Sequence, residues 1–185
     1  YLGEVGTTEG LAGDFAVYST PEWGMLAGSM QLDSYVHRHG DKTKGTLAGV
    51  ITRHAPPTIN KATGKPENDT DTYIKNMRAA LEAFGVAEKG DKFDSRNIKQ
   101  HVALLIAMTS KESGKSFPWT KETLVHAVNN ATRVWQRADG KWDRKGLMFP
   151  DNDLAENLEI VREDGIATVT LYGVKVTVGE DGAPA

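Results

Sequence analysis

Apolar residues recur at helical spacing in five successive segments of the first 140 residues. The first segment begins at Thr20, where a hydroxyl cap is followed by Pro21 in the first turn and by Glu22 near the positive helix end. Gly40 predicts where this helix ends. The other four helices are expected near residues 47–54, 73–84, 98–114 and 120–140, the last ending near Gly140.

The fourth segment is the most apolar, because Val102 to Met108 contains almost no polar residue. A helix that is apolar on all sides is typically buried. We therefore expect this segment to form the central helix, which begins near Ile98 and ends at residues 111–114. Residues 1–14 hold four glycines and predict a loop, and residues 15–18 predict a short strand.

The pattern changes after Gly140. Residues 142–157 have no clear period, whereas residues 160–161, 166–171 and 174–178 are rich in β-branched side chains. Asp164-Gly165 and Tyr172-Gly173 separate these runs, and such pairs favour tight hairpins. The sequence thus predicts a mainly α domain, residues 1–140, with a C-terminal appendage, residues 141–185, that contains a small antiparallel β-meander.

A polar helix start follows the second helix. Pro56 and Pro57 must end that helix, because prolines lack a backbone donor and restrict the preceding residue. After a polar loop, Asn68 or Asp69 can cap the next helix with a side-chain oxygen. We interpret the stretch from His54 to Ile74 as the mouth of a cleft.

Composition argues against several classes of protein. The chain has 185 residues and a net charge of −3, without the basic excess of a general nucleic-acid binder. It has no cysteine, which excludes disulfides and thiol catalysis, and no apolar run long enough to span a membrane. It begins at Tyr1 rather than Met, so we expect a processed product or the ordered part of a larger protein.

Glu112 is the strongest candidate for catalysis. It lies at the end of the apolar helix, just before a glycine, where burial and the negative helix end would raise its pKa. A carboxyl group that stays protonated can donate a proton to a glycosidic oxygen. The alternative is an ordinary solvated carboxylate between Lys111 and Lys115.

Other polar and aromatic residues could complete such a site. Glu67, Asp69 or Asp71 could supply a second carboxylate, although capping and solvation are alternative roles for them. Sugar rings could stack on Tyr73, Phe117 or Trp119, which could equally be core residues. We expect no metal site, because His37 and His39 lack a third ligand in a recognisable spacing, and we expect no cofactor.

The order of several motifs resembles a family of phage virion structural proteins that are related to lysozyme-like peptidoglycan-degrading enzymes. The resemblance covers about residues 1–130. Its motifs are Phe15-x-x-Tyr18-x-x-Pro21-x-x-Gly24-Met25, Ile51-x-x-His54-Ala55-Pro56-Pro57, Glu67-Asn68-Asp69-Thr70-x-x-Tyr73-Ile74 and Glu112-Ser113-Gly114. The last motif is also similar to the end of the catalytic helix in lytic transglycosylases, which carry a single essential Glu.

The resemblance implies a lysozyme-like helical domain in which Glu112 is the acid/base. The substrate-binding residues it implies are Glu67, Asn68, Asp69, Thr70, Tyr73, Ser113 and Trp119. The chain departs from the family at Leu26, where Arg is usual, at His54, where Trp is common, and in its longer loop between Pro57 and Glu67. These departures bear on activity more than on fold.

We therefore expect a muramidase or lytic transglycosylase of the phage virion, which opens peptidoglycan in the host cell envelope or periplasm for genome delivery. Its partners would be glycan strands and other virion proteins, the latter contacted through residues 141–185, with no nucleic-acid specificity and no membrane span. The alternative is a catalytically inactive structural or ejection protein of the virion that uses the same fold for binding or assembly.

Overall fold

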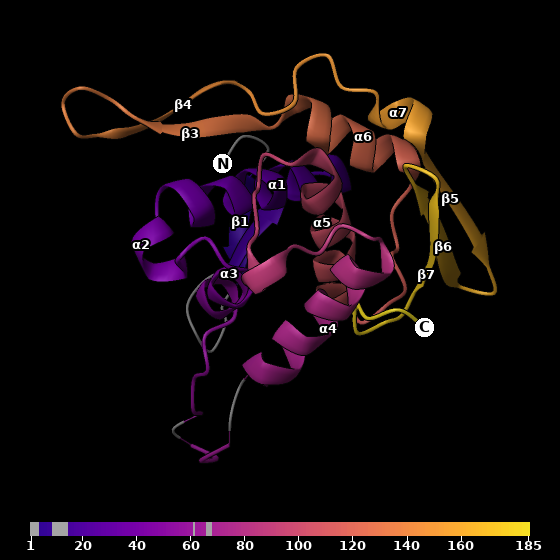
Figure 1. The fold of residues 1–185 in the computed structure, drawn as a ribbon. Helices are drawn as coiled ribbons and strands as arrows, with labels where there is room; N and C mark the ends of the chain where they lie inside the picture. Colours follow the sequence, from indigo (N-terminus) through magenta and orange to yellow (C-terminus); the bar gives the residue numbers. More distant parts are fainter. Residues whose placement is uncertain (1–3, 9–14, 61, 66–67) are drawn as a thin grey trace.

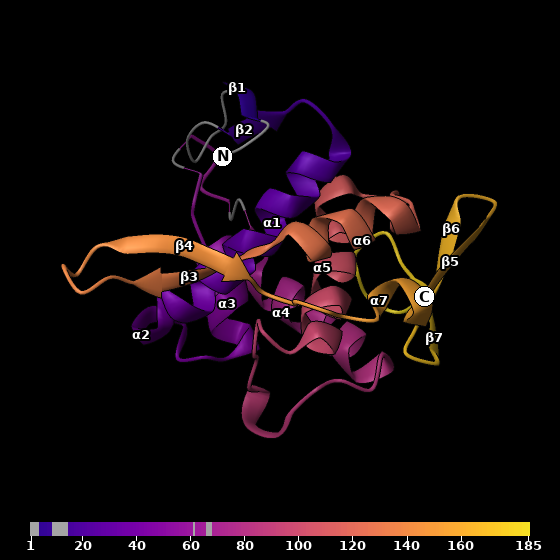
Figure 2. The same ribbon diagram turned by 90° about the horizontal axis from the view of Figure 1, so that it is seen from above.

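Helix α5 (Ile98–Ser113) runs through the middle of the molecule, as the two ribbon views of this computed structural model show (Figure 1, Figure 2). The structure describes residues 4–8, 15–60, 62–65 and 68–185. Every side chain from Val102 to Met108 is buried. The predicted central helix is therefore confirmed, and it begins where the Asn97 side chain accepts hydrogen bonds from the Lys99 and Gln100 amides.

Helices surround α5 on most sides. They are α1 (Pro21–His37), α2 (Gly40–Thr43), α3 (Leu47–His54), α4 (Thr70–Ala83), α6 (Lys121–Asn130) and α7 (Leu154–Asn157), with a short 3-10 helix η1 (Lys89–Asp91). Three of them begin at a side-chain cap: Thr46 for α3, Asp69 for α4 and Thr120 for α6. Each cap satisfies a backbone donor that the first helical turn leaves free.

The strands form three separate antiparallel sheets. They pair β1 (Glu4–Thr8) with β2 (Phe15–Tyr18), β3 (Thr132–Gln136) with β4 (Trp142–Leu147), and β5 (Leu158–Glu163) with β6 (Ile166–Leu171) and β7 (Val174–Val178). Both turns of the last sheet have two consecutive residues with positive φ, at Asp164-Gly165 and Tyr172-Gly173. That conformation matches the twist of the strands. A mainly α protein with a C-terminal β-meander is confirmed.

Two predicted helix ends are wrong, and β1, β4 and α7 lie where the sequence predicts no regular structure. Helix α1 ends at His37, and Gly40 begins the short helix α2 instead of ending α1. The fifth helix ends at Asn130, not near Gly140. Strand β3 then occupies the rest of the predicted helix, and β4 lies within residues 142–157, for which the sequence predicts irregular structure. Helix α7 lies in that region too, and β1 lies within the expected N-terminal loop.

The mistaken helix has a physical explanation. Ala131 and Trp135 continue the helical spacing of α6, but the buried carboxylate of Asp33 accepts a hydrogen bond from the Val134 amide and holds the chain extended there. Asp139-Gly140 then reverses the chain, with Gly140 at φ 79°. A contact between residues 101 positions apart thus overrides the local pattern.

The meander belongs to the same buried cluster as the helices. Val169, Leu171 and Val178 are part of that cluster, together with the central residues of α5. Ser116 ties the two parts together, because its hydroxyl donates to the Val178 carbonyl and accepts from the Ala167 amide. The division at residue 140 stays a prediction, and residues 158–178 contribute directly to the core.

Polar groups inside the core connect distant elements. Asp33 on α1 accepts hydrogen bonds from the Ser95 hydroxyl and from Arg96 Nε, both at 3.1 Å. His101 on α5 lies 2.6 Å from the Ser29 hydroxyl and 2.9 Å from the Ser95 carbonyl oxygen. Because a carbonyl only accepts, Nδ1 of His101 carries the proton and Nε2 accepts from Ser29.

The buried helix allows a test of core packing. Leu104→Ala should lower the free energy of unfolding by roughly 2–5 kcal/mol, because Leu104 is fully buried and its loss leaves a cavity. Leu147→Ala is the matched control, since that leucine is 43% exposed. Equal losses for the two variants in denaturant titrations would contradict the central position of α5.

His101 predicts a pH dependence of stability. Burial lowers its pKa from the ordinary value to about 4. Between about pH 6.5 and pH 4, His101 is therefore protonated in the unfolded chain but neutral in the folded chain. The free energy of unfolding should decrease as pH falls through this range, by up to about 1.4 kcal/mol per pH unit. His101→Gln should reduce this slope in unfolding curves measured across the range. An unchanged slope would contradict a buried neutral His101.

Candidate active site

A cleft of about 600 Å³ opens between α1, the end of α3 and the C-terminal half of α5. Its walls are mostly apolar, with Met25, Leu32, Leu105 and Met108 among the lining residues. Gly24 and Gly28 also line it, and because they are one helical turn apart they leave the same face of α1 without side chains. The cleft is therefore largely a product of α1 and α5 lying side by side.

Glu112 reaches this cleft from the last turn of α5. The helix ends at Gly114, which has a left-handed conformation (φ 60°) and donates its amide to the Lys111 and Ser110 carbonyls. Glu112 is the only carboxylate among the described residues that line the cleft. Its position at the end of the apolar helix is as predicted.

Two side chains bind one oxygen of Glu112. The Tyr73 hydroxyl donates to Oε1 at 2.6 Å, and His54 Nε2 lies 3.2 Å from the same atom. On its other side, His54 Nδ1 lies 3.4 Å from the Tyr35 hydroxyl. Four residues from α1, α3, α4 and α5 thus form one chain of polar contacts.

The electrostatics of Glu112 differ from the sequence-based expectation. Its side chain is 56% exposed, and the hydrogen bond from His54, followed by that from Tyr73, lowers its pKa below the ordinary value. Burial acts in the opposite direction but is the smaller effect beside His54. The prediction of a raised pKa is therefore wrong for this structure, because donors that favour the ionised form outweigh desolvation.

Tyr73 is the predicted binding residue that the structure brings to Glu112. It is 4% exposed, and burial together with the adjacent carboxylate raises the pKa of its hydroxyl. It therefore remains a proton donor over the whole physiological range. The buried ring fixes where the hydroxyl points, so Tyr73 positions Glu112 rather than offering a face to a sugar.

Of the other predicted binding residues, some line the cleft and some do not. Ser113 and Trp119 line the cleft. Asn68, Asp69 and Thr70 do not line it: Asn68 donates to the Pro56 carbonyl, Asp69 caps α4 and Thr70 donates to the Ala55 carbonyl. These three residues hold the α3–α4 corner together.

Two further candidates have clear outcomes. Phe117 is fully buried, so of the two roles considered for it, stacking on a sugar or packing in the core, the structure shows the core role. Glu67 lies outside the described residues. The sequence gives no sign that Tyr35 belongs to the site. It places His54 at the mouth of the cleft, but not in contact with Glu112.

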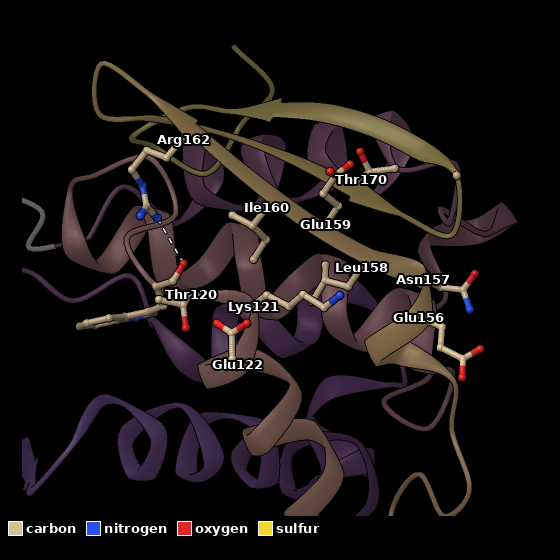
Figure 3. Close-up of a pocket in the computed structure, with 12 residues that line it drawn as sticks. Thr120, Lys121, Glu122, Glu156, Asn157, Leu158, Glu159, Ile160, Arg162 and Thr170 are labelled. Atoms are coloured by element: carbon tan, nitrogen blue, oxygen red, sulfur yellow. Dashed lines mark hydrogen bonds between the residues drawn. The ribbon is translucent and has the colours of Figure 1, made fainter.

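A second hollow, of about 620 Å³, lies between the start of α6 and strand β5. Figure 3 shows that its lining residues include the cationic Lys121 and Arg162 and the acidic Glu122 and Glu159. Arg162 Nη2 donates to the Phe117 carbonyl and, at 3.2 Å, to the Trp119 carbonyl, so it braces the loop before α6. Trp119 lines both hollows and thereby marks where they adjoin.

Within the described part of the chain, no group of three or more His, Cys, Asp or Glu side chains could hold a metal ion. None of the described helices has the length and apolar character to cross a membrane.

Tyr73→Phe should raise the pKa of Glu112, because it removes a donor that stabilises the ionised form. The measurement is an NMR titration of the Glu112 side-chain carboxyl carbon. Tyr172→Phe is the matched control, because the Tyr172 hydroxyl donates to Asp153 instead. A Glu112 titration that both variants leave unchanged would contradict the hydrogen bond.

Comparisons of the chain with protein-family models, with curated proteins and with solved structures found no match.

Proposed function

We propose that the protein is a peptidoglycan-degrading glycosidase in which Glu112 transfers the proton. The observation that carries the proposal is a single carboxylate at the end of a buried helix, facing an apolar cleft and held by a tyrosine and a histidine. Perturbed carboxylates in clefts are frequent at catalytic sites. The motif resemblance described above supports the same residue.

The cleft has the chemistry that a sugar chain requires. Tyr18, Tyr35 and Trp119 line it beside the apolar side chains, and aromatic rings can pack against the apolar faces of sugars. Gln31 and Thr109 add polar groups that can bind hydroxyls. An apolar cleft with few polar groups orients a ligand while excluding water.

Glu112 must be protonated to act as a general acid, whereas the unliganded site favours its ionised form. A glycan in the cleft would remove water from the carboxyl group, and desolvation raises its pKa. If the substrate also displaces His54, the largest cause of the lowered pKa is lost. Proton donation then breaks the glycosidic bond, and the resulting carboxylate takes a proton from the attacking hydroxyl.

The absence of a second carboxylate among the described residues of the cleft favours the lytic type over the muramidase type. Hydrolysis of both stereochemical types commonly uses two carboxyl groups that flank the scissile bond. A reaction in which a hydroxyl of the sugar itself attacks needs one acid/base only. Glu112 can serve in both halves of such a reaction.

The virion assignment rests on the motif resemblance. In this proposal the enzyme travels with the phage particle, contacts other virion proteins through residues 141–185 and acts in the host envelope. Its substrates are the glycan strands of peptidoglycan.

A catalytically inactive virion protein is the second candidate. The half-exposed, ionised Glu112 favours this inactive candidate. A carboxylate that accepts hydrogen bonds from Tyr73 and His54 can serve to hold the helices together without taking part in catalysis. In that case the cleft would bind glycan or a partner without cleaving a bond.

The variant Glu112→Gln distinguishes the enzyme from the inactive virion protein. For the enzyme, this variant should abolish the release of glycan fragments from purified peptidoglycan while the thermal midpoint changes little, since glutamine keeps the size and can still accept from Tyr73. Fragment release is measured by zymography and by mass spectrometry, which also separates hydrolytic from lytic products by one water.

Glu163→Gln is the control, because it makes the same chemical change at an exposed strand end. It should leave fragment release unchanged. Wild-type protein that binds peptidoglycan but releases no fragments at any pH from 4 to 8 would exclude the enzyme and support the inactive candidate.

A further inference from the structure

The β3–β4 hairpin, residues 132–147, extends away from the body as an arm on the side opposite the meander (Figure 1, Figure 2). Nothing in the proposed glycosidase reaction uses it. We propose that this arm binds single-stranded nucleic acid without sequence preference. The inference is independent of the proposed function.

The charge of the arm is opposite to that of the rest of the chain. It carries five cationic and two acidic side chains, a net charge of +3, in a protein whose net charge is −3. The cationic residues are Arg133, Arg137, Lys141, Arg144 and Lys145. A local excess of this kind provides the electrostatic attraction on which nucleic-acid binding depends.

One face of the arm combines cations with an aromatic ring, and the acidic Asp143, which pairs directly with Trp135, lies on the same face. Side chains alternate along a strand, so Arg133 and Trp135 project on the same side, and Arg137 follows them beyond the strand end. Lys145 comes from β4 to the same face, because its Nζ lies 5.2 Å from the centre of the Trp135 ring. All four side chains are exposed, Trp135 to 43%.

Spacing and chemistry suit a nucleic-acid strand. Alternate residues of a strand are roughly 6.6 Å apart, so Arg133 and Arg137, roughly 13 Å apart, can reach phosphates on either side of a base that stacks on the indole of Trp135. The Lys145 side chain is flexible and its ammonium can move from the ring to a phosphate. An Arg137–Asp139 ion pair at 3.4 Å neutralises part of the charge near the tip.

The base of the arm is fixed, so this face is held out in a defined direction. Val134 donates its amide to Asp33 and accepts from Arg96 Nη2 at 2.9 Å through its carbonyl. Asp33 is completely buried. A rigid ribbon loses little conformational freedom when it binds.

A lipid surface fits the arm less well. Residues 137–141, which form the tip, are Arg137, Ala138, Asp139, Gly140 and Lys141, and they offer no large apolar side chain for insertion. Trp142 pairs with Gln136, one position along the ribbon from the Trp135–Asp143 pair, and therefore belongs to the opposite face. The two indoles cannot enter one membrane interface together.

The test measures the fluorescence anisotropy of a labelled 20-nucleotide DNA strand of mixed sequence as the full chain is added at 50 and 200 mM salt. The affinity should fall with salt, with a logarithmic slope of about −2 for phosphate contacts by the three cations of this face. Trp135→Ala should weaken binding roughly 5- to 150-fold through the lost stacking. Trp135→Phe should restore most of it.

Arg133→Glu combined with Arg137→Glu should weaken binding at least 10-fold and make the salt slope shallower. The control is Lys89→Glu combined with Lys175→Glu, two exposed residues on η1 and β7, outside the arm, with the same change in net charge. Thermal melts establish that each variant is folded. Equal weakening by the two double variants would overturn the proposal.

Two other results would also overturn it: no binding of the strand at 50 mM salt, or binding of anionic phospholipid vesicles without binding of the strand. Tighter binding of a duplex of the same sequence would exclude the stacking role of Trp135. Quenching of tryptophan fluorescence by the unlabelled strand, lost in Trp135→Phe, would support direct stacking on this residue.

Discussion

The burial of α5 is the constraint on which the rest of the structure depends. Because its residues from Val102 to Met108 are enclosed, helices, loops and the meander must all pack around one axis. The helix also has to bury polar groups, and His101 meets partners from α1 and from the loop before α5. Glu112, in the last turn of α5 just after the apolar part of the helix, lines the cleft.

Features determined by neighbouring residues could be predicted from the sequence. Thr120 caps a helix start and the Asp-Gly turn of the meander marks a hairpin, because caps and turns involve contacts a few residues apart. Thr20 also precedes a helix start, but its side chain makes no capping hydrogen bond, so the hydroxyl cap predicted there is wrong. The β3–β4 hairpin could not be predicted in the same way. Its strand conformation depends on Asp33, whose burial and partners follow from tertiary packing.

In the candidate site, too, local features could be predicted from the sequence and tertiary contacts could not. Glu112 could be found because it follows an apolar helix and precedes a glycine, and Tyr73 because of its motif. Their contact, and the part played by His54, depend on how α3 and α4 lie against α5. The direction of the Glu112 pKa depends on that contact too, since a sequence shows burial tendencies but not which donors converge on one oxygen.

Helix α1 connects the cleft with the arm. Leu32 lines the cleft, and the next residue, Asp33, holds the base of β3 from the other side of the same helix. A displacement of α1 therefore alters both places at once. If the arm and the cleft each bind a ligand that favours one position of this helix, thermodynamic linkage requires the two affinities to change by the same factor.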